Sequence, residues 1–226
     1  MKLLAIDTAT EACSVALNIN GAVIEHYEVL PRSHSRELLP MVDKLLTEAG
    51  LVLTEIDGVA FGCGPGAFTG LRVAAAMVQG LAYAVDIPVI PVSTLASLAQ
   101  QGYRCHGAQQ AVSAIDARMN EVYWGAYIEQ GQLMMSVQDE MVTAPEKVTT
   151  PAFVDDDNDW IGIGNGWRFM KRMTTNISHC YEQALPHAMD IALLAAAYFA
   201  QGRLLPAEDA VPIYLRNNVA KKKSER

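Results

Sequence analysis

The chain has 226 residues, of which 51% are hydrophobic and 19% are charged, so it can bury a full core and is not expected to be disordered. Its formal net charge of −8 argues against a protein that holds nucleic acid over a broad surface of its own, because neutralising phosphates needs clustered lysine and arginine; contact with RNA inside a larger assembly stays open. Scattered cysteines without a C-x-x-C pair, a short apolar start before Asp7 and a longest strongly apolar run of residues 191–200 predict a cytoplasmic protein with reduced thiols, no signal peptide and no membrane segment.

The chain is expected to open as a strand, an acidic turn and a hairpin. Residues 3–6 are continuously apolar, which is typical of a strand at the centre of a sheet. Residues 13–19 alternate apolar with small or polar side chains and predict a half-buried strand. Asn20-Gly21 is a strong hairpin signal, after which residues 22–29 return as a third strand.

An amphipathic helix is predicted next. It starts at Ser33 or Ser35, either of which can cap it, and runs to about Glu48, with Gly50 as its stop signal. Its apolar positions follow helical spacing and are Leu38, Leu39, Val42, Leu45 and Leu46. Residues 56–61 then form a fourth strand.

A glycine-rich turn joins that strand to a second apolar helix, with glycines at Gly62, Gly64, Gly66 and Gly70. Such a turn exposes backbone N–H groups at a helix N-terminus, which suits an anion; the alternative is a tight crossover packed against neighbouring chain. A Walker loop is excluded because Leu71 and Arg72 follow the last glycine. The spacing also fits G-x-G-x-x-A, but the next strand, residues 89–92, lacks the acidic residue after it, so a Rossmann domain is a disfavoured alternative.

After a helical stretch at residues 95–101 and a boundary at residues 102–110, the second half repeats the order of the first. Ala114-Ile115-Asp116 repeats Ala5-Ile6-Asp7 at the end of an apolar strand, and a hairpin follows, with its turn at Gly131. We predict a duplicated α/β fold, with an N-terminal lobe at residues 1–108 and a C-terminal lobe at residues 109–226 that face each other across a cleft. Strand 160–163, helix 191–200 and an extended segment at 212–216 complete the second lobe.

Candidate chemistry is confined to the two strand ends. Asp7, Thr8, Thr10 and Asp116 could hold a phosphate and a magnesium-bound water, or simply form turns that tie the strand ends. The five histidines show no i, i+4 pair and no serine stands in a G-x-S-x-G elbow. The acidic run at residues 155–159 is interpreted as a solvated loop rather than a cation site, and the lysines at 221–223 as a frayed tail.

Several motifs together resemble the bacterial TsaB (YeaZ) family. They are the start LAIDTATEACSVAL at residues 4–17, the helix that begins at Ser33-His34-Ser35, and the glycine block within residues 56–93. Asp116-Ala-Arg118 with Glu121-Val-Tyr123 also matches that family. The likeness spans the chain and thins toward the C-terminus.

The resemblance implies an actin-like ATPase fold (ribonuclease H-like) and kinship with the TsaD family, which transfers a threonylcarbamoyl group onto adenosine 37 of tRNAs reading codons that begin with A. Catalytic relatives carry a His-x-x-x-His pair that holds a metal. Here residues 93–98 read Ser-Thr-Leu-Ala-Ser-Leu, which offers no good metal ligand. We therefore predict a non-catalytic subunit with no metal and no intrinsic cofactor.

The partners implied by the resemblance are a TsaD-family catalytic subunit and a TsaE-type ATPase, with tRNA, and ATP or ADP, engaged only through the complex. The family pairs through helices of its N-terminal half, which maps the interface onto Leu38, Val42, Leu45, Leu46, Met77, Gly80 and Tyr83. Alternatively these residues are simply core. Without the partner, the same surface is expected to close a homodimer.

Two competing hypotheses assign an activity to the chain itself. The first is an independently active ATPase or phosphotransferase that uses the four strand-end residues. The second is a peptidase, which the missing histidine pair disfavours.

Overall fold

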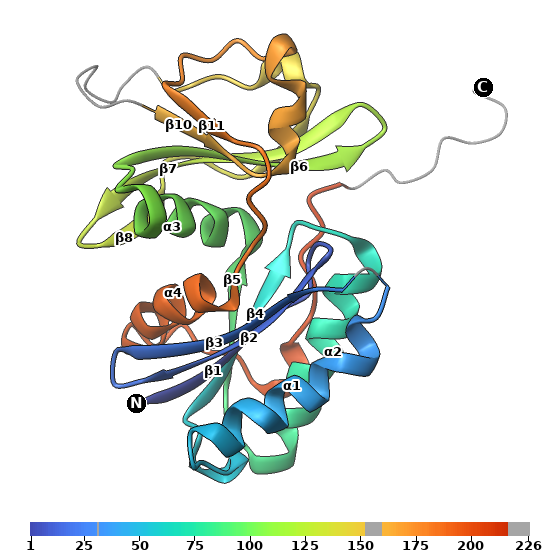
Figure 1. Cartoon of the computed structure of the whole chain (residues 1–226), viewed down its shortest axis with the longest axis vertical. Coiled ribbons are helices and arrows are strands. Elements are labelled where there is room, and N and C mark those ends of the chain that lie inside the picture. The colour runs from blue at the N-terminus through green and yellow to red at the C-terminus, as the bar shows by residue number, and fades with distance from the viewer. Residues whose placement is uncertain (31, 152–159, 217–226) are drawn as a thin grey trace, which may run out of the picture.

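The computed structural model describes residues 1–30, 32–151 and 160–216; the acidic run at 155–159 and the lysines at 221–223 lie outside these ranges. Two sheets are stacked with two helices, α3 (Thr94–His106) and α4 (Ala188–Ala200), in the layer between them (Figure 1). Two further helices, α1 (His34–Glu48) and α2 (Phe68–Val85), cover the outer face of the first sheet.

The first sheet has the strand order β3-β2-β1-β4-β5. Its strands are β1 (Lys2–Asp7), β2 (Ala12–Ile19), β3 (Ala22–Val29), β4 (Gly58–Gly64) and β5 (Val89–Ser93). The first three form an antiparallel meander, whereas β1, β4 and β5 run parallel.

The second sheet repeats this pattern in the order β11-β10-β6-β7-β8, with β9 paired to β7. Its strands are β6 (Gln110–Arg118), β7 (Glu121–Gln130), β8 (Leu133–Ser136), β9 (Met141–Thr143), β10 (Trp160–Ile163) and β11 (His179–Tyr181). Again three strands form an antiparallel meander, and β6, β10 and β11 run parallel. The duplicated α/β fold is confirmed.

Strand β2 differs from its prediction. It was expected to be half-buried, yet every residue from Ala12 to Asn18 is buried. The reason is that α1 and α4 pack on its two faces, and the second of these helices comes from far along the chain. The small residues that alternate with the larger ones leave room for α4 rather than facing water.

Helix α3 is longer than expected and runs through the predicted boundary to His106. Ser93 caps it, because its Oγ accepts hydrogen bonds from the N–H groups of Leu95 and Ala96. Gly102 lies inside this helix, at a position where a side chain would be crowded. A Cβ there would lie 2.9 Å from Ile161 Cδ1 on β10. The glycine therefore marks a close helix–sheet approach and not a linker.

The predicted boundary at residue 108 separates the strands of the two sheets, but it does not separate the helices according to the sheet on which they pack. Helix α3 packs mainly on the second sheet, whereas α4 packs on the first. The C-terminal segment also returns to the first sheet, where Leu205 bridges to Val89 and the Ile213 N–H donates to the Cys63 carbonyl at 2.7 Å. Helix α4 and the segment from Leu205 to Ile213 therefore pack with the first sheet, although the predicted boundary placed them in the second lobe.

One hydrophobic cluster joins the two lobes. It contains Leu3 and Ile90 of the first sheet, Ile115 and Ile161 of the second, and Ile191 of α4 between them. The lobes therefore share a core instead of meeting at a polar interface.

An ion pair reinforces this junction. Arg104 on α3 donates from Nε and Nη2 to the two carboxylate oxygens of Asp190 on α4, both at 2.8 Å, and the Asp190 side chain is fully buried. Such a two-bond pair fixes both distance and orientation between the helices.

The remaining helical segments are short 3-10 turns. They are η1 (Leu53–Glu55), η2 (Pro145–Lys147), η3 (Asn165–Arg172) and η4 (Ala207–Asp209). By length and composition alone α2 would suffice to cross a membrane, but it packs on β4 with one face in the core, as a helix of a folded domain does.

Candidate functional site

Asp7 ends β1 with a carboxyl group that is fully buried. Its Oδ1 accepts a hydrogen bond from the Ala9 N–H at 3.0 Å, while Oδ2 has no hydrogen-bond partner in the described part of the chain. On the adjacent strand, a Cβ at Gly62 would lie 2.0 Å from that Oδ2, so only glycine leaves room for the carboxyl group. Burial raises the pKa of Asp7 from 3.8 to about 7.

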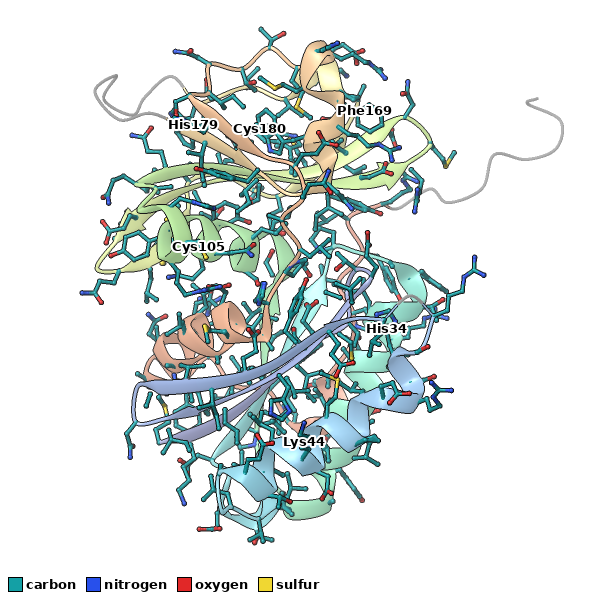
Figure 2. The ribbon with its side chains drawn as sticks, viewed as in Figure 1. His34, Lys44, Cys105, Phe169, His179 and Cys180 are labelled. Atoms are coloured by element: carbon teal, nitrogen blue, oxygen red, sulfur yellow. The ribbon has the colours of Figure 1, made fainter. Side chains whose placement is uncertain are left out.

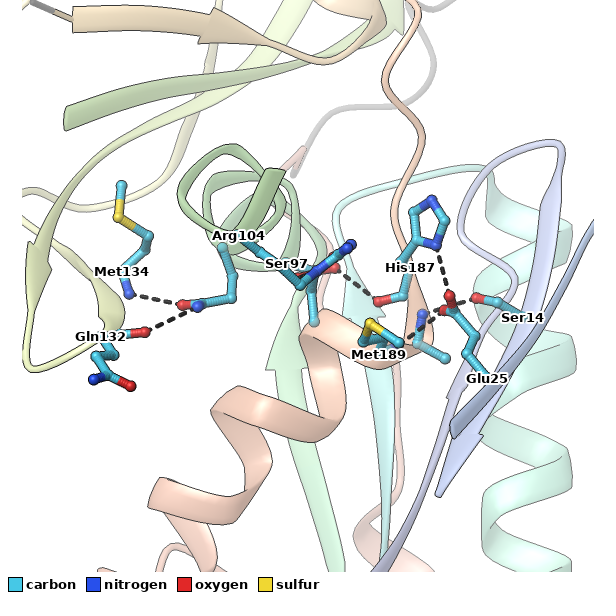
Figure 3. Close-up of polar contacts among 11 residues, drawn as sticks. Ser14, Glu25, Ser97, Arg104, Gln132, Met134, His187 and Met189 are labelled. Carbon is cyan, nitrogen blue, oxygen red and sulfur yellow. Dashed lines mark hydrogen bonds and ion pairs between the residues drawn. The ribbon is translucent and has the colours of Figure 1, made fainter. Parts of the chain in front are cut away.

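A polar cluster beside Asp7 holds the start of α4. Glu25 Oε1 on β3 accepts from the Met189 N–H at 3.0 Å, and its Oε2 lies 2.9 Å from His187 Nδ1 (Figure 3). Ser14 Oγ on β2 accepts from the Ala188 N–H at 2.9 Å. The His187 ring also stacks on Tyr27, with 4.1 Å between centroids. Side chains of the first sheet therefore satisfy the free N–H groups of this helix.

The same junction continues onto α3. Ser97 Oγ on α3 donates to the His187 carbonyl at 3.3 Å (Figure 3). Gln100 donates to the Gln132 carbonyl at 3.0 Å and accepts from the Met134 N–H at 2.9 Å. Residues 93–98 are thus used for capping α3 and for a hydrogen bond to the segment just before α4.

The glycine turn packs against the turn that follows Asp7. Thr8 Oγ1 donates to the Gly70 carbonyl at 2.8 Å, and the Ala67 N–H donates to the Ala9 carbonyl at 2.7 Å. A Cβ at Gly70 would lie 1.9 Å from the Thr8 carbonyl oxygen, and one at Gly66 would lie 2.5 Å from that of Ala9. Gly64, at φ +121°, sits as closely against the Ile213 carbonyl. This geometry is that of the tight crossover, the alternative to an anion site.

Asp116 is neutralised by its own lobe. Its Oδ2 lies 3.3 Å from Arg118 Nη1 and 3.1 Å from Arg168 Nη2, and its Oδ1 accepts the Arg118 N–H at 2.9 Å. The Asp116 side chain is 5% exposed. Two guanidinium groups thus share one almost buried carboxylate.

The predicted nucleotide residues do not converge on one site. A cavity of about 510 Å³ opens between the lobes, lined by Thr10, Thr69 and Gly70 on one side and Arg118 on the other. Neither Asp7 nor Asp116 lines it, so Thr10 alone of the four residues faces this space. The four residues therefore do not surround a common space, Asp116 is already paired with two arginines, and the geometry gives the ATPase hypothesis no support. Among the described residues, no three His, Cys, Asp or Glu side chains gather as a metal site.

The predicted partner surface needs correction on α1. The four residues of α1 that were predicted to contact the partner point into the core of the first lobe, where each is at most 8% exposed. They are Leu38, Val42, Leu45 and Leu46. An amphipathic helix buries this stripe against its own sheet, so only residues at its edge reach the surface. Leu39, at 51% exposure, is the one that does.

Between α1 and α2 lies an apolar groove of about 670 Å³, hereafter the α1–α2 groove. Its lining includes the predicted Met77 and Gly80 and, not predicted, Ser35, Leu39, Phe68, Val73, Ala76 and Leu81. Phe68 is 56% exposed at one end of the groove. Tyr83, 78% exposed, lies beyond the other end and lines a separate cavity with Pro88 and Leu205.

Comparisons with known proteins agree over almost the full length. The family model described as "TsaD: tRNA N6-adenosine threonylcarbamoyltransferase" matches residues 23–224. The chain is 42% identical over 227 residues to the tRNA threonylcarbamoyladenosine biosynthesis protein TsaB of Escherichia coli, covering 99% of this chain and 98% of that protein. It is 40% identical to the Haemophilus influenzae protein of the same name, covering 99% and 97%. The solved structure of YeaZ from Pseudomonas aeruginosa superposes with a TM-score of 0.91 at 50% identity, covering 95% of this chain and 99% of that one.

The chain belongs to the TsaB (YeaZ) family. Both the resemblance and the actin-like, ribonuclease H-like fold that it implied are therefore confirmed.

Some features of this TsaB-family chain had no visible signal in the sequence. His187 and Glu25 are 162 positions apart, and nothing in the local pattern of either indicates that they meet. Arg168 reaches Asp116 from η3, a segment far along the chain from β6, and no local pattern indicates this contact. Leu39 and Phe68 lie at the edges of the apolar stripes of their helices, so helical spacing alone does not separate them from the buried positions.

Proposed function

We propose that this chain is a non-catalytic subunit required for threonylcarbamoyl transfer to N6 of adenosine 37 in tRNAs that read codons starting with A. It binds a TsaD-type catalytic subunit and, with a TsaE-type ATPase, supports the active arrangement of that enzyme. The names of its relatives support the reaction, and the α1–α2 groove is the observation that carries the accessory role.

The groove has the properties of a protein-binding surface. Large apolar side chains that a monomer would normally bury stand exposed at it, notably Leu39 and Phe68. Gly80 lies in the groove with no atom within 4 Å of its virtual Cβ, so the α2 backbone is open to close approach there. A helix of the partner that lies along the groove would cover these groups together.

Two further elements of the proposal follow from this surface. When the catalytic subunit is absent, a second copy of the chain covers the groove and gives a homodimer. ATP or ADP acts in the complex and not as a resident cofactor of this chain, because its two strand-end carboxyl groups are already committed or buried.

The test uses two variants with the same added side chain. Gly80→Arg fills the groove without touching the fold, because nothing lies within 4 Å of the position where its Cβ would be. Thr47→Arg places the same side chain on an exposed position of α1 that does not line the groove. Each is mixed with the TsaD-type enzyme, and the Kd is measured by titration together with the rate of tRNA modification in the reconstituted system.

Gly80→Arg should weaken binding at least about 30-fold, the effect of losing one central contact of an interface, and should lower the modification rate in proportion. Thr47→Arg should bind and act like the wild type. Equal binding by Gly80→Arg and wild type would place the partner elsewhere. A modification rate that does not depend on adding the wild-type chain would refute the accessory function itself.

A further inference from the structure

Four arginines from three separate segments converge on the turn between β6 and β7. Arg118 belongs to this turn. Arg172 of η3 donates to Asn120 Oδ1 in the turn, and Arg216 donates to Met119 Sδ at 3.3 Å and pairs with Glu121 just after it. Arg168 reaches the same place through Asp116. We call these four residues the arginine cluster.

The turn itself has an uncommon backbone. Arg118, Met119 and Asn120 are consecutive non-glycine residues in the left-handed region, at φ +62°, +52° and +63°. Their side chains are pushed outward: Arg118 is 81% exposed and Met119 is 65% exposed. Strained backbone of this kind is concentrated at binding sites, where surrounding contacts hold it.

The cluster carries an excess of positive charge on an acidic protein. Its four guanidinium groups share three carboxylates, those of Asp116, Glu121 and Glu146. Lys171 adds an exposed ammonium group on η3, between Arg168 and Arg172. The whole chain has a formal net charge of −8, so this concentration of basic groups is local.

The ion pairs of the cluster leave it available to a stronger anion. The Arg172 and Glu146 side chains are 36% and 53% exposed, and an exposed pair of this kind contributes little to stability. Arg118 and Arg168 are also exposed, whereas Arg216, at 13% exposure, is held against the turn by Glu121. A phosphate group can accept from a guanidinium fork through two oxygens at once. Phe169 lies on η3 (Figure 2). The Arg168 guanidinium is 4.7 Å and that of Arg172 is 5.6 Å from the Phe169 ring centroid, and these contacts steady both side chains.

We propose that the arginine cluster is a contact surface for the phosphate backbone of RNA, so that this chain touches the tRNA directly as well as supporting the enzyme that modifies it. The inference rests on the proposed function for the identity of the RNA. It goes beyond that function because it assigns the RNA contact to residues of this chain around the β6–β7 turn, none of which lines the α1–α2 groove.

Salt-dependent binding tests the inference. The probe is an unmodified tRNA transcript that reads a codon starting with A, and the Kd is measured by fluorescence anisotropy from 0.05 to 0.3 M salt with the full-length chain, alone and in its complex with the TsaD-type enzyme. Arg168→Gln/Arg172→Gln removes two charges from the cluster. Lys44→Gln/Arg203→Gln, the matched control, removes two from elsewhere; Figure 2 shows Lys44 on the far helix α1.

Each lost phosphate contact lowers the slope of log K against log salt by about 0.7–0.9, so the cluster variant should lose about 1.4–1.8 from its slope. At 0.1 M salt this corresponds to a Kd about 25- to 60-fold higher. The control variant should change neither the salt slope nor the Kd by more than about twofold. Lys171→Gln/Arg172→Gln repeats the measurement with two residues that are not paired with Asp116, in case the first pair disturbs that buried carboxylate.

Equal slopes for wild type and both cluster variants would overturn the inference. So would displacement of the tRNA by poly-glutamate at equal charge concentration, which would indicate an acidic protein as the partner. A cluster variant whose KM for tRNA matches the wild type, in a complex that modifies tRNA only with this chain present, refutes the RNA contact and leaves the proposed function standing.

Discussion

The buried carboxyl group of Asp7 makes the stability of the chain depend on pH. Burial raises its pKa from 3.8 to about 7, so the folded chain keeps this proton over a range in which the unfolded chain has released it. The associated stability is fully present below pH ~4 and is lost as the pH rises through about 7. At ~1.4 kcal/mol per pKa unit, the total loss is about 4 kcal/mol.

Asp7→Asn removes this titration while keeping the shape of the side chain. The amide oxygen can still accept the Ala9 N–H, and the amide nitrogen takes the place of the unpartnered Oδ2, at a cost of about 1–3 kcal/mol that does not vary with pH. For a group that titrates near 7, about 2.5 kcal/mol of the loss falls between pH 5 and pH 8. The stability of the variant relative to the wild type should therefore rise by about 2.5 kcal/mol over that interval.

Urea denaturation followed by far-UV circular dichroism at pH 5 and pH 8 measures the effect. The difference in Tm between variant and wild type should also shift by about 5–10 °C between the two pH values, given the size of the chain. Asp43→Asn is the control, since Asp43 is exposed on α1 and its carboxylate keeps its water in the folded chain. A difference between Asp7→Asn and wild type that stays constant from pH 5 to pH 8 would refute the reasoning.

Further predictions concern the two glycines of α2 and the inter-lobe ion pair. Gly70→Ala should lower the free energy of unfolding by about 3 kcal/mol or more, because its Cβ would lie 1.9 Å from the Thr8 carbonyl oxygen. Gly80→Ala should raise the free energy of unfolding by about 0.5–1 kcal/mol, because its Cβ meets no atom within 4 Å and alanine favours the helix. Urea titrations in which both variants change stability in the same direction would contradict this. Arg104→Ala should cost about 3–5 kcal/mol because it leaves the Asp190 carboxylate buried without its partner, and Arg104→Leu/Asp190→Leu should recover most of that loss in the same assay. A double variant no more stable than the single one would show that the pair is needed for more than charge compensation.

The fold could be predicted from the sequence because the same order of elements occurs twice along the chain. The repeat of a short apolar strand, an aspartate and a hairpin predicted two lobes of one topology, and both sheets have it. What the pattern could not reveal was the exchange of helices between lobes. Helix α4 follows the second sheet in the chain but packs on the first, and no local property of residues 188–200 encodes which sheet they cover.

The candidate site was predicted less well, for a physical reason. Sequence indicates which side chains end a strand, but not whether other groups already occupy their polar atoms. Asp7 and Asp116 end equivalent strands of the two lobes. The Asp7 carboxyl group is buried against Gly62 on the adjacent strand, whereas the Asp116 carboxylate is paired with Arg168 from a distant segment. Likewise, helical spacing identified the apolar stripe of α1, and the burial of Leu45 shows that this stripe serves the core.

The two proposed contact surfaces lie on different lobes, so the junction between the lobes determines how they act together. The α1–α2 groove belongs to the first lobe, and the arginine cluster belongs to the second. Opening a hinge between them would break the Arg104–Asp190 pair and separate residues of a common core, such as Ile161 and Ile191. A catalytic subunit bound in the groove and an RNA bound at the cluster are therefore held at a fixed separation and orientation. Such a junction opposes the hinge closure by which many two-lobed proteins enclose a substrate, and it suits a chain whose two proposed surfaces must keep one relative placement.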